Sequence, residues 1–286
     1  MTTMKKRNWK RKFLLAGALV STLIITSACA QLTEAEYARI LQLEEADEPD
    51  LTLEQLIAKM HEATDPLNAF QDAKSYRMGQ KIVSTKNLEK NNSPHDEYSM
   101  EILYKTPDRM RYTSMRDGKP FSILVFNGDR AWYQDPKTQK VVMIPQGTAL
   151  NLVKAFSGML RPGQNMTDIF KSIEVGVLFQ NREKLYRLIC RVEDPAIAPY
   201  VIYVDGSTFL TRKIETILYA EDGSTYLYQA VSESYAWMSN VKMALTSIVT
   251  TTGKQQDVST ITGFVLNPEI PDSEFEIPVP FTHQAE

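Results

Sequence analysis

Cysteine and histidine are scarce in this chain of 286 residues. It has two cysteines, Cys29 and Cys190, and three histidines, His61, His95 and His283. The histidines lie far apart in the sequence and have no spacing typical of a metal site, so we predict solvated surface positions and no metal. Two cysteines allow one disulfide at most, and fold stability therefore has to come from a hydrophobic core.

The sequence also lacks the short motifs of common enzyme classes. It contains no G-x-S-x-G nucleophile elbow and no glycine-rich phosphate loop. Ser239 and Lys242 fit the S-x-x-K pattern, but they lie in a predicted turn and strand, where the helical geometry of that motif is unavailable. The acidic pair Glu193 and Asp194 falls at a predicted strand end, where solvation explains it. We therefore expect no enzymatic activity and no cofactor.

A long apolar run is missing, and the short one that is present is typical of an export signal. Six basic residues between positions 5 and 12 precede Phe13–Ile25, which is free of charge. As a helix this run would be about 20 Å long, against roughly 30 Å for the hydrocarbon core of a bilayer. The segment is predicted to direct export and not to span a membrane permanently.

The end of this run, LIITSACAQ at residues 23–31, offers two cleavage sites. Cleavage before Cys29 would leave that cysteine ready to carry lipid, and Thr26-Ser27-Ala28-Cys29 resembles the bacterial lipobox, although leucine is its usual first residue. Cleavage after Ala30, at an A-x-A site, would instead remove the cysteine. We predict acylation of Cys29, with the ordinary secretory cut as the alternative. In both cases Cys190 has no intramolecular partner, and it is predicted to be a buried free cysteine.

Positive charge is scarce once the leader is removed. The whole chain has a net charge of −3, and loss of the six basic residues takes the mature protein to about −9. No basic cluster remains, so nucleic acid is not an expected partner. Membrane attachment would have to come from acyl chains.

Helical and strand patterns divide the chain into three parts. We predict a lipoprotein-type signal over residues 1–28, an acidic helical linker over 29–50 and one lipid-binding domain over 51–286. Thr33 with Glu36, and Thr52 with Gln55, form capping boxes that predict two helices, ending before Pro49 and Pro66.

From Ala73 onward, apolar residues recur at every second position, and the chain is predicted to be mainly β. About eleven strands are expected, with helical spacing only around Thr148–Leu160 and Met166–Ile173. Tight turns such as Asn127-Gly128 and Asp205-Gly206 link consecutive strands, which predicts antiparallel pairing. So many strands predict a strongly curved, open antiparallel sheet covered by a few helices.

One face of such a sheet can be filled by side chains or can line a ligand cavity, and the alternation leaves both possibilities open. The candidates for the cavity lining are the apolar residues of the strands between positions 98 and 133: Met100, Ile102, Tyr104, Met110, Tyr112, Phe121, Ile123, Val125 and Trp132.

Residues 104–145 resemble the core of the outer-membrane lipoprotein-sorting family, which includes LolA and LolB and is related to RseB and LppX. The matching pieces, in order, are Thr106-Pro107, Arg109 to Tyr112, Ile123 to Phe126, Asn127-Gly128, Trp132-Tyr133 and Asp135-Pro136. The segment NPEIPDSEFEIPVP, with Phe275 and Pro280, also resembles the last strand of that family, and the resemblance spans residues 51–280.

The resemblance implies an open β half-barrel whose hydrophobic cavity receives acyl chains of lipids or lipoproteins, for binding or transfer without bond chemistry. One position departs from the pattern, because LolA-type carriers have arginine before the proline and this chain has Thr106. Simple binding is therefore favoured over a gated carrier cycle.

Location and the alternative function follow from the same features. With Cys29 acylated and followed by Ala30, the protein is expected on the outer membrane, anchored by lipid and facing the periplasm; without the acyl group it would be soluble there. The alternative function is an RseB-like regulatory or scaffold module that recognises a protein partner in the cell envelope.

Overall fold

The structure, a computed structural model, describes nine stretches of the chain: residues 34–41, 43, 45–87, 96–128, 130–144, 166–193, 197–219, 225–251 and 255–277. Several predicted features lie outside these residues: the signal over 1–28, Cys29, Thr33, His95, the helix over Thr148–Leu160, Pro280 and His283. Among the described residues, no helix is long and apolar enough to span a membrane.

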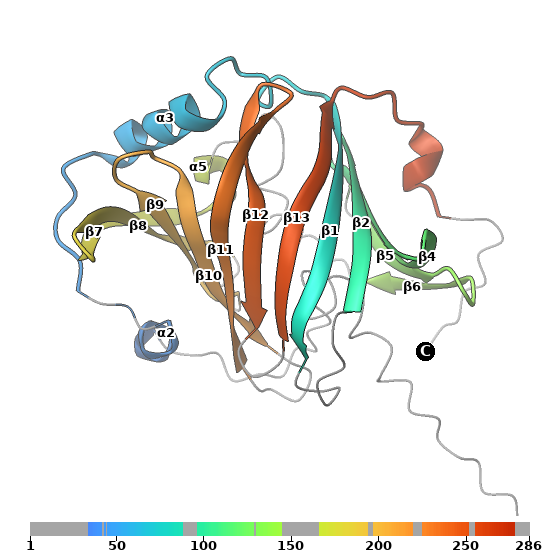
Figure 1. The fold of residues 1–286 in the computed structure, drawn as a ribbon, viewed down its shortest axis with the longest axis horizontal. Coiled ribbons are helices and arrows are strands. Elements are labelled where there is room, and N and C mark those ends of the chain that lie inside the picture. The colour runs from blue at the N-terminus through green and yellow to red at the C-terminus, as the bar shows by residue number, and fades with distance from the viewer. Residues whose placement is uncertain are drawn as a thin grey trace, which may run out of the picture.

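One antiparallel sheet of thirteen strands forms the framework of the fold (Figure 1). Its strands are β1 (Ser75–Asn87), β2 (Asp96–Lys105), β3 (Arg109–Arg116), β4 (Lys119–Asn127), β5 (Arg130–Asp135), β6 (Lys140–Ile144), β7 (Ser172–Gln180), β8 (Glu183–Arg191), β9 (Tyr200–Asp205), β10 (Thr211–Tyr219), β11 (Thr225–Met238), β12 (Val241–Thr251) and β13 (Gln255–Leu266). The order across the sheet is β6-β5-β4-β3-β2-β1-β13-β12-β11-β10-β9-β8-β7. Two meanders, β1 to β6 and β7 to β13, are therefore joined by the pairing of β1 with β13.

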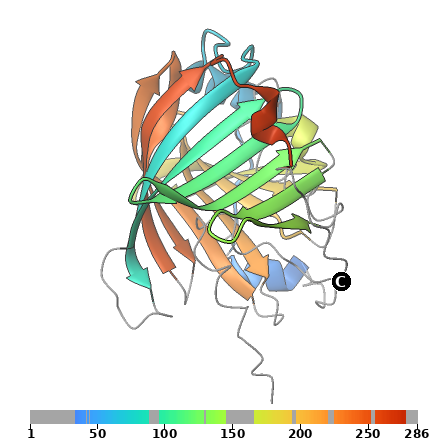
Figure 2. The same cartoon turned by 90° about the vertical axis from the view of Figure 1, so that its right-hand side faces the viewer.

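The predicted β class, antiparallel pairing and open sheet are confirmed, but the number of strands and the strong curvature are wrong. The two strands missed by periodicity are β1 and β3. Strand β1, SYRMGQKIVSTKN, carries Gly79 at its middle and the polar Gln80 in the row of Met78 and Ile82, which weakens its alternation. The sheet stays open, with β6 and β7 at its edges, and is not strongly curled. Separate segments cover its two ends, so its apolar faces are buried without the sheet closing on itself (Figure 2).

Helix α3 (Leu53–Thr64) confirms the second capping box. The backbone N–H of Gln55 donates to Thr52 Oγ1 at 3.3 Å, and the backbone N–H of Thr52 donates to Gln55 Oε1 at 2.9 Å. Its stripe packs against β7–β9, where Leu56 is fully buried. The helix ends two residues before Pro66, as predicted.

The remaining helices are shorter than predicted. Helix α2 (Glu34–Ile40) packs Tyr37 and Leu41 on the face of β7–β10 opposite to α3. The described residues that follow α2 are not helical. Among them, Asp47 exchanges two backbone hydrogen bonds with Val177 at the β7 edge of the sheet. The predicted helix over Met166–Ile173 is confined to α5 (Met166–Ile169), because β7 begins at Ser172.

Candidate functional site

The first candidate surface is the face of β1–β4 that carries methionine and tyrosine side chains, here called the methionine face. Its buried cluster contains Tyr76, Met78, Tyr98, Met100, Ile102, Tyr104, Met110, Leu124 and Phe126 from these strands, with Tyr112 and Phe121 packed against it. Tyr76 stacks on Tyr104 with ring centroids 5.2 Å apart, and Phe264 of β13 lies 5.7 Å from Tyr76. The side chains of this cluster are buried among one another, and burial raises the pKa of the Tyr112 hydroxyl.

Apolar side chains also lie on this side of the other half of the sheet, beyond the buried polar pair Ser84–Asp257. Directly paired strand residues share a face, and the pairs Leu188–Ile202, Ile202–Ile214, Ile214–Ala230 and Ala230–Val249 form one row from β8 to β12. Helices α3 and α5 cover the β7–β9 end of this row. The methionine face and the α3-covered cluster therefore lie on the same side of one sheet.

The structure brings six of the nine candidate cavity residues together and places three on the opposite face. Met100, Ile102, Tyr104, Met110, Tyr112 and Phe121 belong to the methionine face. Ile123, Val125 and Trp132 lie in a separate cluster on the other side, with Ile270 and Phe275.

A β-bulge accounts for this division. Ser114 pairs with Ser122 and Met115 pairs with Pro120, which leaves Phe121 as an extra residue in β4. The strict alternation that joined Phe121, Ile123 and Val125 in one row is broken at this point, and Phe121 turns to meet Tyr98 edge-on. Pro120 was the available signal, because proline inside a strand is confined to edges, strand starts and bulges.

The second candidate surface lies between the other face of β3–β5 and residues 268–277, here called the C-terminal strap. The strap contains the short 3₁₀ helix η5 (Asp272–Phe275) and buries Phe275 completely against the sheet. Between strap and sheet there is a cavity of about 300 Å³. Ile123, Val125, Trp132 and Ile277 supply its apolar lining, and Arg111, Gln134, Glu274 and Glu276 supply polar groups.

Three cations of β2 and β3 hold the strap. Asp272 receives ion pairs from Lys105 and Arg109, the latter at 2.8 Å, and Arg111 pairs with Glu274. The hydrogen bond from Lys105, followed by the charge of Arg109, lowers the pKa of the Asp272 carboxyl. Sequence reasoning noted Arg109 and Arg111 but missed their partners, although the acidic run of the segment PDSEFE was the available signal.

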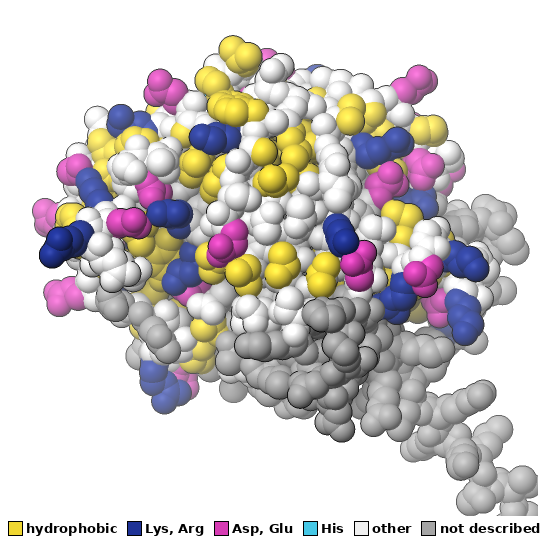
Figure 3. Space-filling model, viewed as in Figure 1, with side chains coloured by type: hydrophobic (Ala, Val, Ile, Leu, Met, Phe, Trp, Pro, Cys, Tyr) yellow, Lys and Arg dark blue, Asp and Glu magenta, His cyan; other side chains and the backbone are white. Residues whose placement is uncertain are grey.

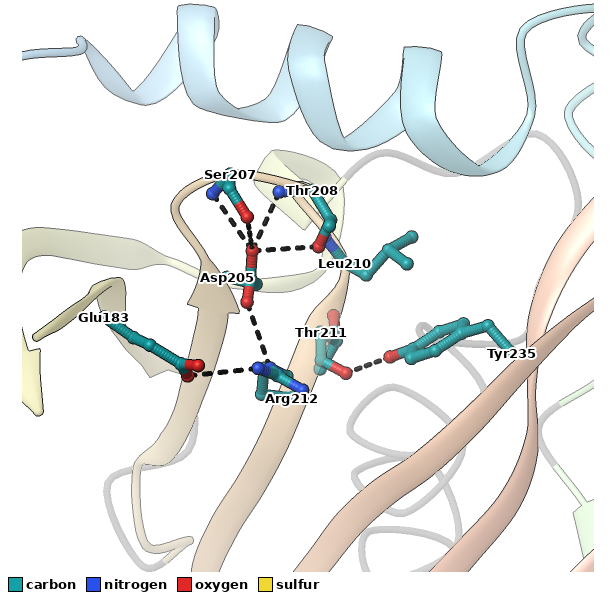
Figure 4. A network of polar contacts seen from close by, with 8 residues as sticks. All are labelled: Glu183, Asp205, Ser207, Thr208, Leu210, Thr211, Arg212 and Tyr235. Atoms are coloured by element: carbon teal, nitrogen blue, oxygen red, sulfur yellow. Dashed lines mark hydrogen bonds and ion pairs between the residues drawn. The ribbon is translucent and has the colours of Figure 1, made fainter. Parts of the chain in front are cut away.

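A cluster of polar side chains at the turn between β9 and β10 stabilises that turn (Figure 4). The Asp205 carboxylate accepts from the backbone N–H groups of Ser207 and Thr208, at 3.0 and 2.8 Å, and from both of their hydroxyls. Arg212 links this carboxylate to Glu183. Burial opposes these contacts, but the hydrogen bonds prevail and lower the pKa of Asp205. The group is stabilised as an anion that fixes the turn.

Groups that could perform chemistry are few among the described residues. Cys190 is free and fully buried, as predicted, and desolvation raises the pKa of its thiol to about 12. Ser239 and Lys242 lie at the hairpin between β11 and β12, so the S-x-x-K pattern is not on a helix, as predicted. In the described part of the chain, no three histidine, cysteine or acidic residues are grouped so that they could hold a metal ion.

Comparison with known proteins identifies the fold. No protein-family model and no curated protein matches the sequence. A LolA superfamily protein from Nitrosomonas europaea superposes with a TM-score of 0.55 at 16% identity, over 79% of this chain and 98% of that one. A DUF1329 family protein from Desulfovibrio piger superposes with a TM-score of 0.53 at 11% identity, over 77% of this chain and 94% of that one.

A putative outer-membrane lipoprotein-sorting domain from Vibrio parahaemolyticus gives a TM-score of 0.48 at 13% identity, over 77% of this chain and 94% of that one. The resemblance predicted from residues 104–145 is confirmed at the level of fold, since the LolA superfamily protein superposes over 79% of this chain. This chain has the fold of the LolA superfamily proteins.

Proposed function

We propose that this protein is a non-enzymatic component of the cell envelope that binds acyl chains of lipids or lipoproteins. The observation that carries the proposal is the methionine face, an apolar surface on one side of an open sheet with the fold of a LolA superfamily protein. Export by the leader and lipid attachment at Cys29, on the outer membrane facing the periplasm, complete the proposal.

The chemistry of the methionine face suits hydrocarbon. Three of its buried side chains, Met78, Met100 and Met110, are unbranched and polarizable, so they can adapt to a flexible chain. Burial of apolar surface contributes about 25 cal/mol per Å², and 200 Å² of an acyl chain would contribute about 5 kcal/mol. No charged group is needed for such binding.

Around the buried cluster lie half-buried apolar side chains, including Met238 and Met243 at the β11–β12 hairpin and Ile261 and Leu266 on β13. These residues form the margin of the methionine face. A ligand chain would contact this margin first and then the residues of the cluster that the sequence singled out, from Met100 to Phe121.

The proposal is tested by lipid content and by a charge placed on this margin. Mass spectrometry of lipid extracted from the purified protein should find stoichiometric acyl chains, and a fluorescent fatty acid should bind. Met243→Glu puts a carboxylate on the methionine face, where desolvation without a partner costs several kcal/mol, so affinity should fall at least about tenfold. The matched control is Ala244→Glu, because adjacent strand residues point to opposite faces.

A protein that purifies without lipid and does not bind the fluorescent fatty acid would refute the proposal. Equal loss of binding in both variants would show that the methionine face is not the binding surface. Incorporation of labelled palmitate into Cys29→Ser at the level of the wild type would refute acylation at Cys29.

A different feature supports a second candidate function, recognition of a protein partner. On the opposite face of the central strands, Val231, Ile248, Val258 and Val83 form a directly paired row of half-exposed aliphatic side chains. Figure 3 shows apolar atoms on this face between charged side chains. Lys81, which shares the face of Val83 on β1, pairs with Glu97 of β2 at 3.0 Å. A regulatory module would use such a flat surface, and Ile248→Asp should then abolish a partner complex without changing lipid content.

A further inference from the structure

The cavity under the C-terminal strap has the features of a ligand site of its own. Its volume of about 300 Å³ is at the lower end of the range for small-molecule pockets. Trp132 and Val125, both about 2% exposed, form its floor on the sheet, and Ile277 of the strap faces them. The space fits one slender apolar group and is too small for a two-chain lipid.

The charges at the rim select the head group of the ligand. Arg111 is paired with Glu274, and Glu276 adds a second carboxylate, so the three charged residues that line the cavity sum to −1. An anionic head group would meet net repulsion there, whereas an uncharged or cationic head would not. Gln134 and Ser273 add uncharged polar groups to the lining.

The strap itself keeps the cavity formed without filling it. Besides the pair of Arg111 with Glu274, which belongs to the lining, two contacts fix the strap: Asp272 is held by Lys105 and Arg109, and Asn127 donates to the backbone carbonyl of Phe275 at 3.1 Å. Phe275 is fully buried against the sheet. These two contacts use no side chain of the cavity lining, so they hold the strap in place without a ligand.

We propose that this cavity binds a single-chain amphiphile with an uncharged or cationic head group, with the alkyl chain against Trp132 and the head at the Glu274–Glu276 rim. The site lies on the opposite side of the sheet from the methionine face, so it is separate from the proposed acyl-binding surface. Each proposal can fail without the other.

Trp132 provides a direct probe, because bromine on an alkyl chain quenches a tryptophan that it touches. Trp9→Phe combined with Trp237→Phe serves as the background, because it leaves Trp132 as the only tryptophan; Trp237 is 56% exposed and would report contacts at the surface. In this protein, 11-bromo-1-undecanol should quench the remaining emission saturably, while 11-bromoundecanoate should bind several-fold more weakly.

A cavity-filling variant and a matched control locate the site. Val125→Phe occupies the cavity and should remove the saturable quenching. Val83→Phe makes the same change at a half-exposed position on β1, away from the cavity, and should leave the saturable quenching intact. Saturable quenching that is unchanged in a folded Val125→Phe protein, checked by circular dichroism, would overturn the proposal.

Glu276→Gln tests the head-group selectivity at an exposed position that does not threaten folding. Removal of one rim charge should strengthen binding of 11-bromoundecanoate by about two- to fivefold, the range of an exposed charge interaction, and leave the alcohol unchanged. An alcohol and a carboxylate that bind equally in both proteins would overturn the assignment of the head group. Met243→Glu, which tests the methionine face, should alter none of these results.

Discussion

The two ends of the sheet are covered by different kinds of segment. At the β7–β9 end, α3 packs on one face and α2 on the other, and all six residues of β9 are buried. At the β3–β5 end, the face opposite the methionine face is covered by the C-terminal strap, with a cavity of about 300 Å³ beneath it. Described side chains of β9 at the helix-covered end are buried on both faces, whereas the strap-covered end retains a cavity.

The difference follows from the periodicity of the covering segment. A helix presents apolar side chains at successive turns, so α3 lays a continuous stripe on the sheet. The strap has only the single turn of η5, after which Phe275 and Ile277 face the sheet while Glu274 and Glu276 lie at the rim. A segment with few inward side chains, held by ion pairs at its margin, covers a sheet without filling the space below.

The largest effect is expected where the strap depends on one side chain. Phe275→Ala removes a fully buried ring, and such truncations typically cost about 4 kcal/mol in free energy of unfolding. Urea denaturation measures the loss, and limited proteolysis should show cleavage in the strap before the sheet. A loss below about 1 kcal/mol would show that the strap does not depend on Phe275.

At the helix-covered end, Leu56→Ala should destabilise the protein by about 3 kcal/mol, because it leaves a void beneath α3. The expected result is a uniform decrease of the unfolding midpoint and no local release of the helix, since the stripe has further members. Ile57→Ala, at a half-buried position on the same helix, serves as the control and should cost less. Equal effects of the two substitutions would contradict the assigned orientation of α3.

The cap of α3 should make a smaller contribution. Thr52→Ala removes the hydroxyl that accepts from the backbone N–H of Gln55, at a cost of about 1 kcal/mol. Thr52→Ser retains the acceptor and should recover most of this stability in the same denaturation assay. If Ser and Ala are equivalent at this position, the capping hydrogen bond does not stabilise the helix.

The smallest effect on stability is expected from the ion pairs of the strap. This effect depends on pH. The pKa of Asp272 is lowered in the folded protein, so its contribution to stability is present above the ordinary carboxyl pKa of 3.8 and is lost as pH falls through the lower folded value. Hydrogen exchange of the strap amides should therefore gain protection between acidic and neutral pH, and more at low salt. In Asp272→Asn this pH dependence should be reduced, while exchange in α3 should not change.

Sequence patterns predicted local features better than the way distant segments meet. The cap and end of α3, the antiparallel hairpins and buried Cys190 depend on neighbouring residues, and the structure confirms them. The division of the candidate cavity residues depends on a bulge at Phe121, and one extra residue in a strand reverses every later assignment of faces. The strap could not be placed on β3–β5 because the partners Arg111 and Glu274 are 163 positions apart.

The pairing of β1 with β13 has a consequence for how the chain matures. The first and last strands lie side by side, and the contact that ends them, from the Lys74 N–H to Asn267 Oδ1, joins residues 193 positions apart. Neither meander can be completed into the full sheet until almost the entire polypeptide has been synthesised, and contacts of such long range slow folding. The proposed export would benefit from this delay, because the chain would stay threadable through a secretion channel until its last strand has emerged.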